Sequence, residues 1–140
     1  MPFTEKGTTP AGQMTGVDIL PYDAIVFASA ARTATPTTQG FAIPVDANSC
    51  MIVIDTTASA APSTVVTIEA YDPAKDGFVP ILASAAIVAN GTVILRVHPG
   101  GATVANLTAD SMITRIMRVS CAHGNANSHT YSVGIHFAQV

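Results

Sequence analysis

The chain has 140 residues, which is enough for one domain with a buried core. Charged residues make up only 11% of the sequence, and the formal net charge is -3. Its six basic residues are scattered, so no cluster could neutralise a run of phosphates, and we expect no nucleic-acid partner. A composition so poor in charge favours a protein that packs against other subunits.

The apolar residues favour β-structure. Val and Ile together number 26 and Thr numbers 17, whereas Leu numbers only 4. Side chains branched at the β-carbon lose rotamer freedom in a helix but pack well on a pleated sheet. Ten Gly and nine Pro supply the turns that many short strands need. We therefore expect an all-β protein.

Residues 1–23 differ in character from the rest of the chain. Prolines interrupt them at positions 2, 10 and 21, and they show no hydrophobic period and no apolar signal-peptide core. We predict an extended N-terminal arm that orders on a binding partner; the alternative is a disordered end. Its candidate anchors on that partner are its apolar residues, namely Phe3, Met14, Val17, Ile19 and Leu20.

From residue 24 onward the sequence predicts short strands at close spacing. The expected strands are residues 24–32, 39–45, 50–56, 64–72, 78–87, 92–98, 113–122 and 128–138. Residues 102–112 are expected to form a loop or one helical turn. About eight strands predict an antiparallel β-sandwich, jelly-roll-like, formed by residues 24–140.

The alternation of apolar residues along these strands predicts which side chains form the core. The residues expected inside are Ile52, Ile54, Val66, Ile68, Val93, Leu95, Met117, Val119, Val133, Ile135 and Phe137.

The uncharged run from residue 77 to residue 95 is long enough to span a membrane. It contains Pro80 and the pair Asn90-Gly91, which favours two strands of a hairpin joined at that pair. We therefore expect no membrane partner.

Few residues in the sequence could perform chemistry. His123 and His129 flank the last loop and could form a metal or proton site, but polar residues at strand ends are the favoured interpretation. Cys50 and Cys121 could pair only if their strands lie close, and buried free thiols are favoured. The sequence contains no Cys pair at metal-ligand spacing, no carboxylate cluster and no His-x-His. We expect no enzyme, cofactor or metal.

Several segments, taken in order, resemble a family of small proteins encoded beside the capsid and tail genes of tailed phages. The matching stretches cover most of residues 24–137 and are residues 26–35, 51–57, 66–73, 81–87, 93–100, 118–123 and 130–134. Within them lie the strings VFASAARTAT, MIVIDTT and VTIEAYDP. The resemblance implies a virion structural protein, with decoration (cement) of the capsid the favoured role.

A protein of this kind is made in the host cytoplasm and binds the major capsid protein on the outer surface of the shell. Symmetry axes of the shell favour self-association, and we expect a homotrimer. One alternative is a head-tail connector or another tail component. A receptor- or carbohydrate-binding module is less favoured, because the chain has no Trp and only three Tyr to stack on sugars.

Overall fold

The structure is a computed structural model that describes residues 18–140. This part of the chain forms nine β-strands and no helix. In chain order the strands are β1 (Asp23–Arg32), β2 (Phe41–Ala42), β3 (Ser49–Ser59), β4 (Thr64–Asp72), β5 (Gly77–Ala83), β6 (Gly91–His98), β7 (Thr108–Asp110), β8 (Ile116–His123) and β9 (His129–Ala138).

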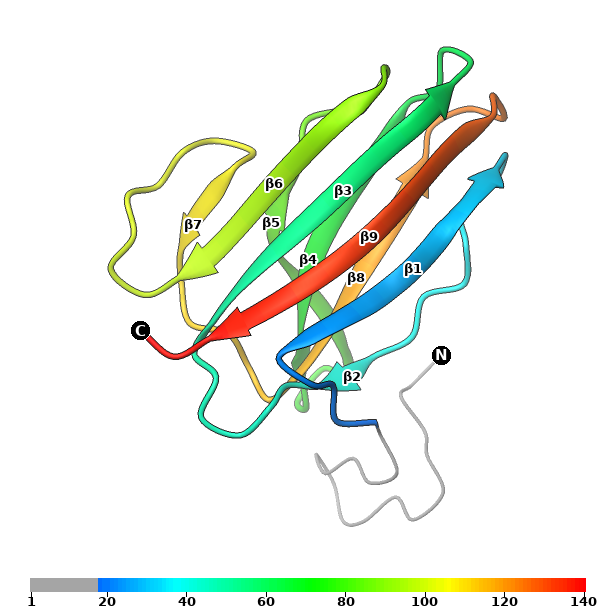
Figure 1. Cartoon of the computed structure of the whole chain (residues 1–140). Helices are drawn as coiled ribbons and strands as arrows, with labels where there is room; N and C mark the ends of the chain where they lie inside the picture. Colours follow the sequence, from blue (N-terminus) through cyan, green and yellow to red (C-terminus); the bar gives the residue numbers. More distant parts are fainter. Residues whose placement is uncertain (1–17) are drawn as a thin grey trace.

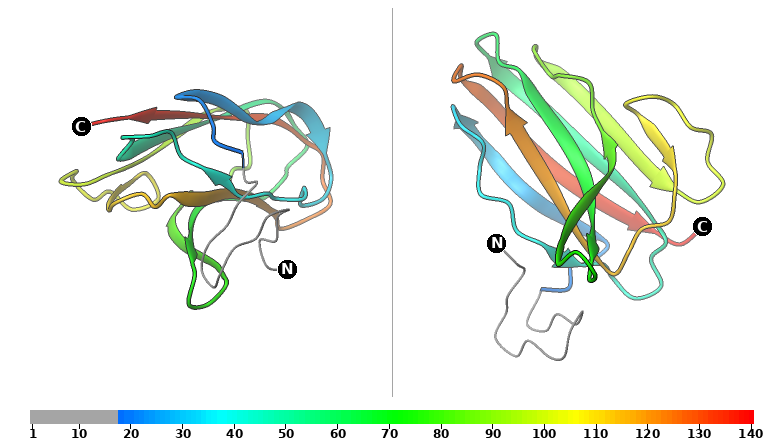
Figure 2. Two further views of the ribbon diagram at one scale, coloured as in Figure 1. Left: turned by 90° about the horizontal axis from the view of Figure 1, so that it is seen from below. Right: turned by 180° about the vertical axis from the view of Figure 1, so that it is seen from behind.

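The strands form two sheets that pack face to face (Figures 1 and 2). The five-stranded sheet has the order β1-β9-β3-β6-β7, and the four-stranded sheet has the order β2-β8-β4-β5. When the short β7 is set aside, the strand order of the two sheets is that of a jelly roll, a double-sheet fold of two Greek keys, in which successive strands change sheet except for the β4–β5 hairpin. The expected β-sandwich is confirmed, although β7 pairs with β6 in parallel rather than antiparallel.

The space between the sheets holds the core, built from one face of each strand. Alternation is regular in β4 and β9, where every second side chain is buried. Ten of the eleven residues predicted for the core are buried, and Val93 packs against the core while staying partly exposed. Both cysteines are buried and unpaired, as expected.

The predicted hairpin at Asn90-Gly91 is wrong. β5 pairs with β4 and β6 pairs with β3, so these two strands belong to different sheets. The Asn90 side chain is bound to the end of β3, accepting from the Ser59 hydroxyl at 2.7 Å and donating to the Thr57 carbonyl at 3.1 Å. An Asn-Gly pair allows a tight turn with positive φ but does not choose which strands pair.

The segment expected to be a loop or a helical turn contains a short strand instead. The chain turns at Asn106, whose φ is 63°, and β7 then adds to the edge of β6. The amide of Arg96 donates to the Leu107 carbonyl at 2.9 Å and begins this pairing. Three residues are too few for hydrophobic alternation to appear, so the sequence carries no signal for this strand.

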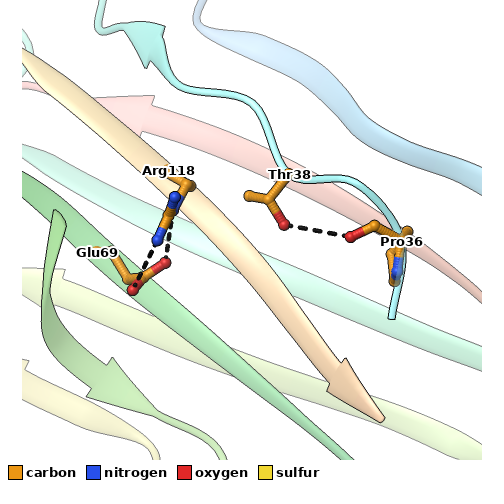
Figure 3. Close-up of polar contacts among 4 residues, drawn as sticks. All are labelled: Pro36, Thr38, Glu69 and Arg118. Carbon is orange, nitrogen blue, oxygen red and sulfur yellow. Dashed lines mark hydrogen bonds and ion pairs between the residues drawn. The ribbon is translucent and has the colours of Figure 1, made fainter. Parts of the chain in front are cut away.

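On the outer face of the four-stranded sheet, an ion pair joins β4 and β8. Arg118 donates through Nε to Glu69 Oε1 at 2.8 Å, and its Nη2 lies 3.3 Å from Oε2 (Figure 3). The Arg118 guanidinium also lies over the Phe78 ring, 4.3 Å from its centroid. The same figure shows the Thr38 hydroxyl donating to the Pro36 carbonyl at 3.5 Å, within the connection from β1 to β2.

Candidate binding surface

One end of the sandwich exposes large apolar side chains. It lies where the described chain begins, where β3 starts and where the C-terminus ends (Figure 1). Soluble monomers rarely gather such side chains in one place unless something binds there. We call this the apolar end and define it by four residues with their exposed fractions: Ile19 (57%), Tyr22 (44%), Val45 (68%) and Val140 (73%).

Hydrogen bonds to the backbone fix the positions of Ile19, Tyr22 and Val45 in the apolar end. Ile19 forms a parallel bridge with Ala42, and the Leu20 amide donates to the Ala42 carbonyl at 3.0 Å. The Tyr22 hydroxyl donates to the Val45 carbonyl at 2.7 Å, which ties the entry to β1 to the connection between β2 and β3. Ile19 and Val45 are therefore presented on a fixed backbone.

Asn48 holds the C-terminus in the same region. Its side-chain amide donates to the Val140 carbonyl at 2.8 Å, and its side-chain oxygen accepts from the Val140 amide at 2.8 Å. The backbone amide of Asn48 also donates to the Ala138 carbonyl at 3.0 Å. These bonds keep Val140 beside the connection that carries Val45.

The structure places two of the five predicted arm anchors. Ile19 belongs to the apolar end, whereas Leu20 is half-buried and packs against the core. Phe3, Met14 and Val17 lie outside the described residues. Val45 and Val140 were not anticipated from the sequence, because no pattern distinguishes an isolated loop or terminal Val from a core residue.

A groove of about 250 Å³ runs between the edge strands β1 and β2. Its apolar lining includes Leu20, Val26, Phe27 and Phe41, and it opens beside Asp18, the first described residue. Asp18, where the described chain begins, thus lies next to both this groove and the apolar end.

At the other end of β9, a fully buried histidine joins the two sheets. His129 Nε2 lies 2.8 Å from the hydroxyl of Thr56 in β3, and its Nδ1 lies 2.8 Å from the hydroxyl of Thr64 in β4. A neutral imidazole has one donor and one acceptor nitrogen, so one hydroxyl donates and the other accepts. All three side chains are buried, which denies a substrate access to this hydroxyl–imidazole pair.

The alternation of β9 could have placed His129. It lies two residues before Tyr131 and shares the buried face of that strand. His129 is a polar residue at a strand end, as expected, but its side chain is buried because hydrogen bonds to Thr56 and Thr64 satisfy it.

An arginine and a second histidine lie close to this histidine. His123 Nε2 is hydrogen-bonded to the Tyr131 hydroxyl at 2.9 Å, and the two histidine rings have centroids 6.2 Å apart. The Arg32 guanidinium lies over the Tyr131 ring, 4.5 Å from its centroid. Burial, then the charges of His123 and Arg32, lower the pKa of His129. Burial and Arg32 also lower the pKa of His123.

The cysteines are poor nucleophiles. Burial raises the pKa of the Cys50 thiol to about 12. Burial also raises that of Cys121 to about 11, against a smaller lowering by a hydrogen bond with Tyr131. Both are protonated near neutral pH, whereas the thiolate is the reactive form.

Neither a metal centre nor a membrane-spanning helix emerges from residues 18–140. No group of three or more His, Cys, Asp or Glu side chains in this range could hold a metal ion, and His123 and His129 gather no third ligand. The same residues include no helix long and apolar enough to cross a membrane.

Comparison with known proteins finds no family model that matches the chain and no similar curated protein.

Proposed function

We propose that the chain is a non-enzymatic structural protein of a tailed-phage particle, a decoration protein that binds the outside of the capsid shell. The apolar end carries this proposal: an exposed apolar surface held on a fixed backbone, at the point where residues 1–17 join the sandwich. The choice of a phage particle rests on the resemblance expected from the sequence alone, since the comparisons match no family.

The energetics of the apolar end suit adhesion to a protein surface. Fully burying a Val or Ile side chain contributes about 1.5–3 kcal/mol. The cost of association consumes part of this gain, so a few such residues give moderate affinity at one site. A decoration protein needs no more than that, because it binds assembled neighbours and stabilises the shell by mass action.

Residues 1–17 are proposed to add to this contact. An extended segment rich in Thr and Gly can pair as an extra strand with an exposed sheet edge of the shell, through main-chain hydrogen bonds. Phe3, Met14 and Val17 are its proposed anchors. The jelly-roll fold is compatible with this role, since viral capsid domains use it, although lectins use it too.

The test is sedimentation of the full chain with empty capsid shells of the phage that encodes it. We expect Val45→Asp combined with Val140→Asp to reduce the bound fraction strongly, because each change buries a charge in the contact. Phe3→Ser combined with Met14→Ser tests the arm in the same way. The matched control is Val88→Asp, because Val88 is 56% exposed and precedes β6, away from the apolar end.

Copy number in purified particles distinguishes this role from the connector alternative. We expect hundreds of copies for decoration, whereas a connector would contribute only one ring. Wild-type binding by the Val45 and Val140 variant would remove the apolar end from the proposal. Absence of the chain from the particle would overturn the proposal as a whole.

A further inference from the structure

We propose that two copies of this chain associate face to face through the outer face of the five-stranded sheet, about a two-fold axis that runs along the strands. By the outer face we mean the side of β1, β9, β3 and β6 that points away from the core. This inference does not depend on the decoration role, because it concerns a different surface.

Side chains at paired positions on neighbouring strands form rows that run across this face. The first row is charged at its two margins. Strand register places Asp23 opposite His136, His136 opposite Met51, and Met51 opposite Arg96. The Asp23 side chain is 79% exposed and lies 2.7 Å from His136 Nδ1. Arg96 is exposed as well, so the row has a negative margin on β1 and a positive margin on β6.

The second row is apolar and has a gap. Ile25 faces Gly134, Gly134 faces Val53, and Val53 faces Ile94. Ile25 is 75% exposed, the highest exposed fraction of any large apolar side chain among the described residues. A Cβ built on Gly134 would meet no atom closer than 3.8 Å, so the surface above this glycine is open.

The third row is polar. Ser132 faces Asp55, and Asp55 faces Thr92, whose hydroxyl lies 3.4 Å from the Asp55 carboxylate. The apolar second row is therefore flanked by hydrogen-bonding groups on both sides, as in the apolar core and polar rim of protein interfaces.

A two-fold rotation about an axis along the strands reverses the order of the strands but leaves each row facing itself. Asp23 of one copy then meets Arg96 of the other, and the same contact occurs twice. Such isologous self-complementarity is what a two-fold dimer requires.

The same rotation also places the second row and the third row each opposite the same row of the other copy. In the second row, Ile25 meets Ile94, and Val53 meets the open surface above Gly134, so a projection fits a gap. In the third row, Ser132 meets Asp55 and can donate to it. The charged margins of the first row, the apolar second row and the Ser132–Asp55 pair of the third row are therefore complementary to themselves under one operation, which makes a second copy the partner of best fit.

The area of the outer face sets the expected stability of the dimer. Strands of this length and spacing give an area of about 30 Å by 20 Å, or roughly 600 Å² per copy. Specific interfaces bury about 800 Å² per partner, so we expect a reversible dimer rather than an obligate one. This proposal differs from the homotrimer expected from the sequence, because a face complementary to itself closes with two copies.

Analytical ultracentrifugation of the full chain tests the proposal. We expect a monomer–dimer equilibrium that weakens as salt screens the Asp23–Arg96 contacts. Arg96→Asp and Asp23→Arg should each raise the dissociation constant at least about tenfold, because like charges then face each other twice. Combining the two changes should restore dimerisation by exchanging the charges.

Two further variants complete the test. Gly134→Val should weaken the dimer, because it fills the gap that Val53 of the second copy needs. Lys75→Asp is the matched control: it makes the same charge reversal as Arg96→Asp but lies in the exposed turn between β4 and β5, so it should leave the equilibrium unchanged. A monomer at all concentrations, a trimer, or a double charge exchange that fails to restore the dimer would each overturn the proposal.

Discussion

Acid should destabilise the folded protein through His129. In the unfolded chain its imidazole has a pKa of about 6.5. In the folded protein burial, His123 and Arg32 lower the pKa of His129. Between those two values the unfolded chain binds a proton that the folded protein does not, so the free energy of unfolding falls as the pH falls below about 6.5. Above that pH this residue adds no pH dependence.

The size of the effect follows from linkage. One histidine can change the free energy of unfolding by at most about 1.4 kcal/mol per pH unit. His129→Gln removes the titrating group while leaving a donor and an acceptor near Thr56 and Thr64. At pH 8 we expect this variant to be less stable by about 1–3 kcal/mol, because the flexible Gln amide cannot hold both threonine hydroxyls in the geometry of the rigid imidazole ring.

Urea unfolding at several pH values between 8 and 5.5 measures both effects. The wild-type protein should lose more stability than His129→Gln below pH 6.5, by at most about 1.4 kcal/mol per pH unit. Comparing the two proteins cancels the contribution of the carboxylates, which both share. Equal slopes for the two proteins would refute the argument that His129 stays neutral in the folded state.

Three other predictions concern the core, the thiols and one turn. Ile68 is fully buried, so Ile68→Ala should lower the free energy of unfolding by about 2–5 kcal/mol in denaturant titration; an unchanged midpoint would contradict its inward position. Cys50 and Cys121 should resist alkylation by iodoacetamide in the native protein and react fully in urea, and fast native labelling would contradict their raised pKa. Gly91 has a φ of 137°, so Gly91→Ala should cost about 1–3 kcal/mol in thermal or urea unfolding. Gly77→Ala, where φ is not positive and an added Cβ meets nothing within 3.6 Å, should cost clearly less; equal costs would contradict strain at Gly91.

The sequence by itself determined the all-β class and most of the core. The two-residue period of β4 and β9 results from the pleat of a strand, which any buried sheet face imposes. Ile68 and Ile135 could therefore be placed inside without knowing their neighbours. The same period also places His129 on the buried face of β9, whereas we predicted only a polar residue at a strand end.

Tertiary structure alone decided which strands are neighbours. Asn90-Gly91 predicts a turn, yet the strands on either side pair with β4 and β3 in different sheets. Strand pairing depends on contacts between residues far apart in the sequence, which local turn chemistry does not encode.

Both candidate surfaces depend on those long-range choices. The apolar end needs Asn48 to bring Val140 beside Val45, and the rows of the outer face need the register that sets Asp23, His136, Met51 and Arg96 side by side. The sequence supplied these side chains, but their arrangement comes from β1 and β9, at opposite ends of the domain, pairing in one sheet. A shift of one residue in that register would turn the outer face toward the core, so the packing of the core is what fixes the surface.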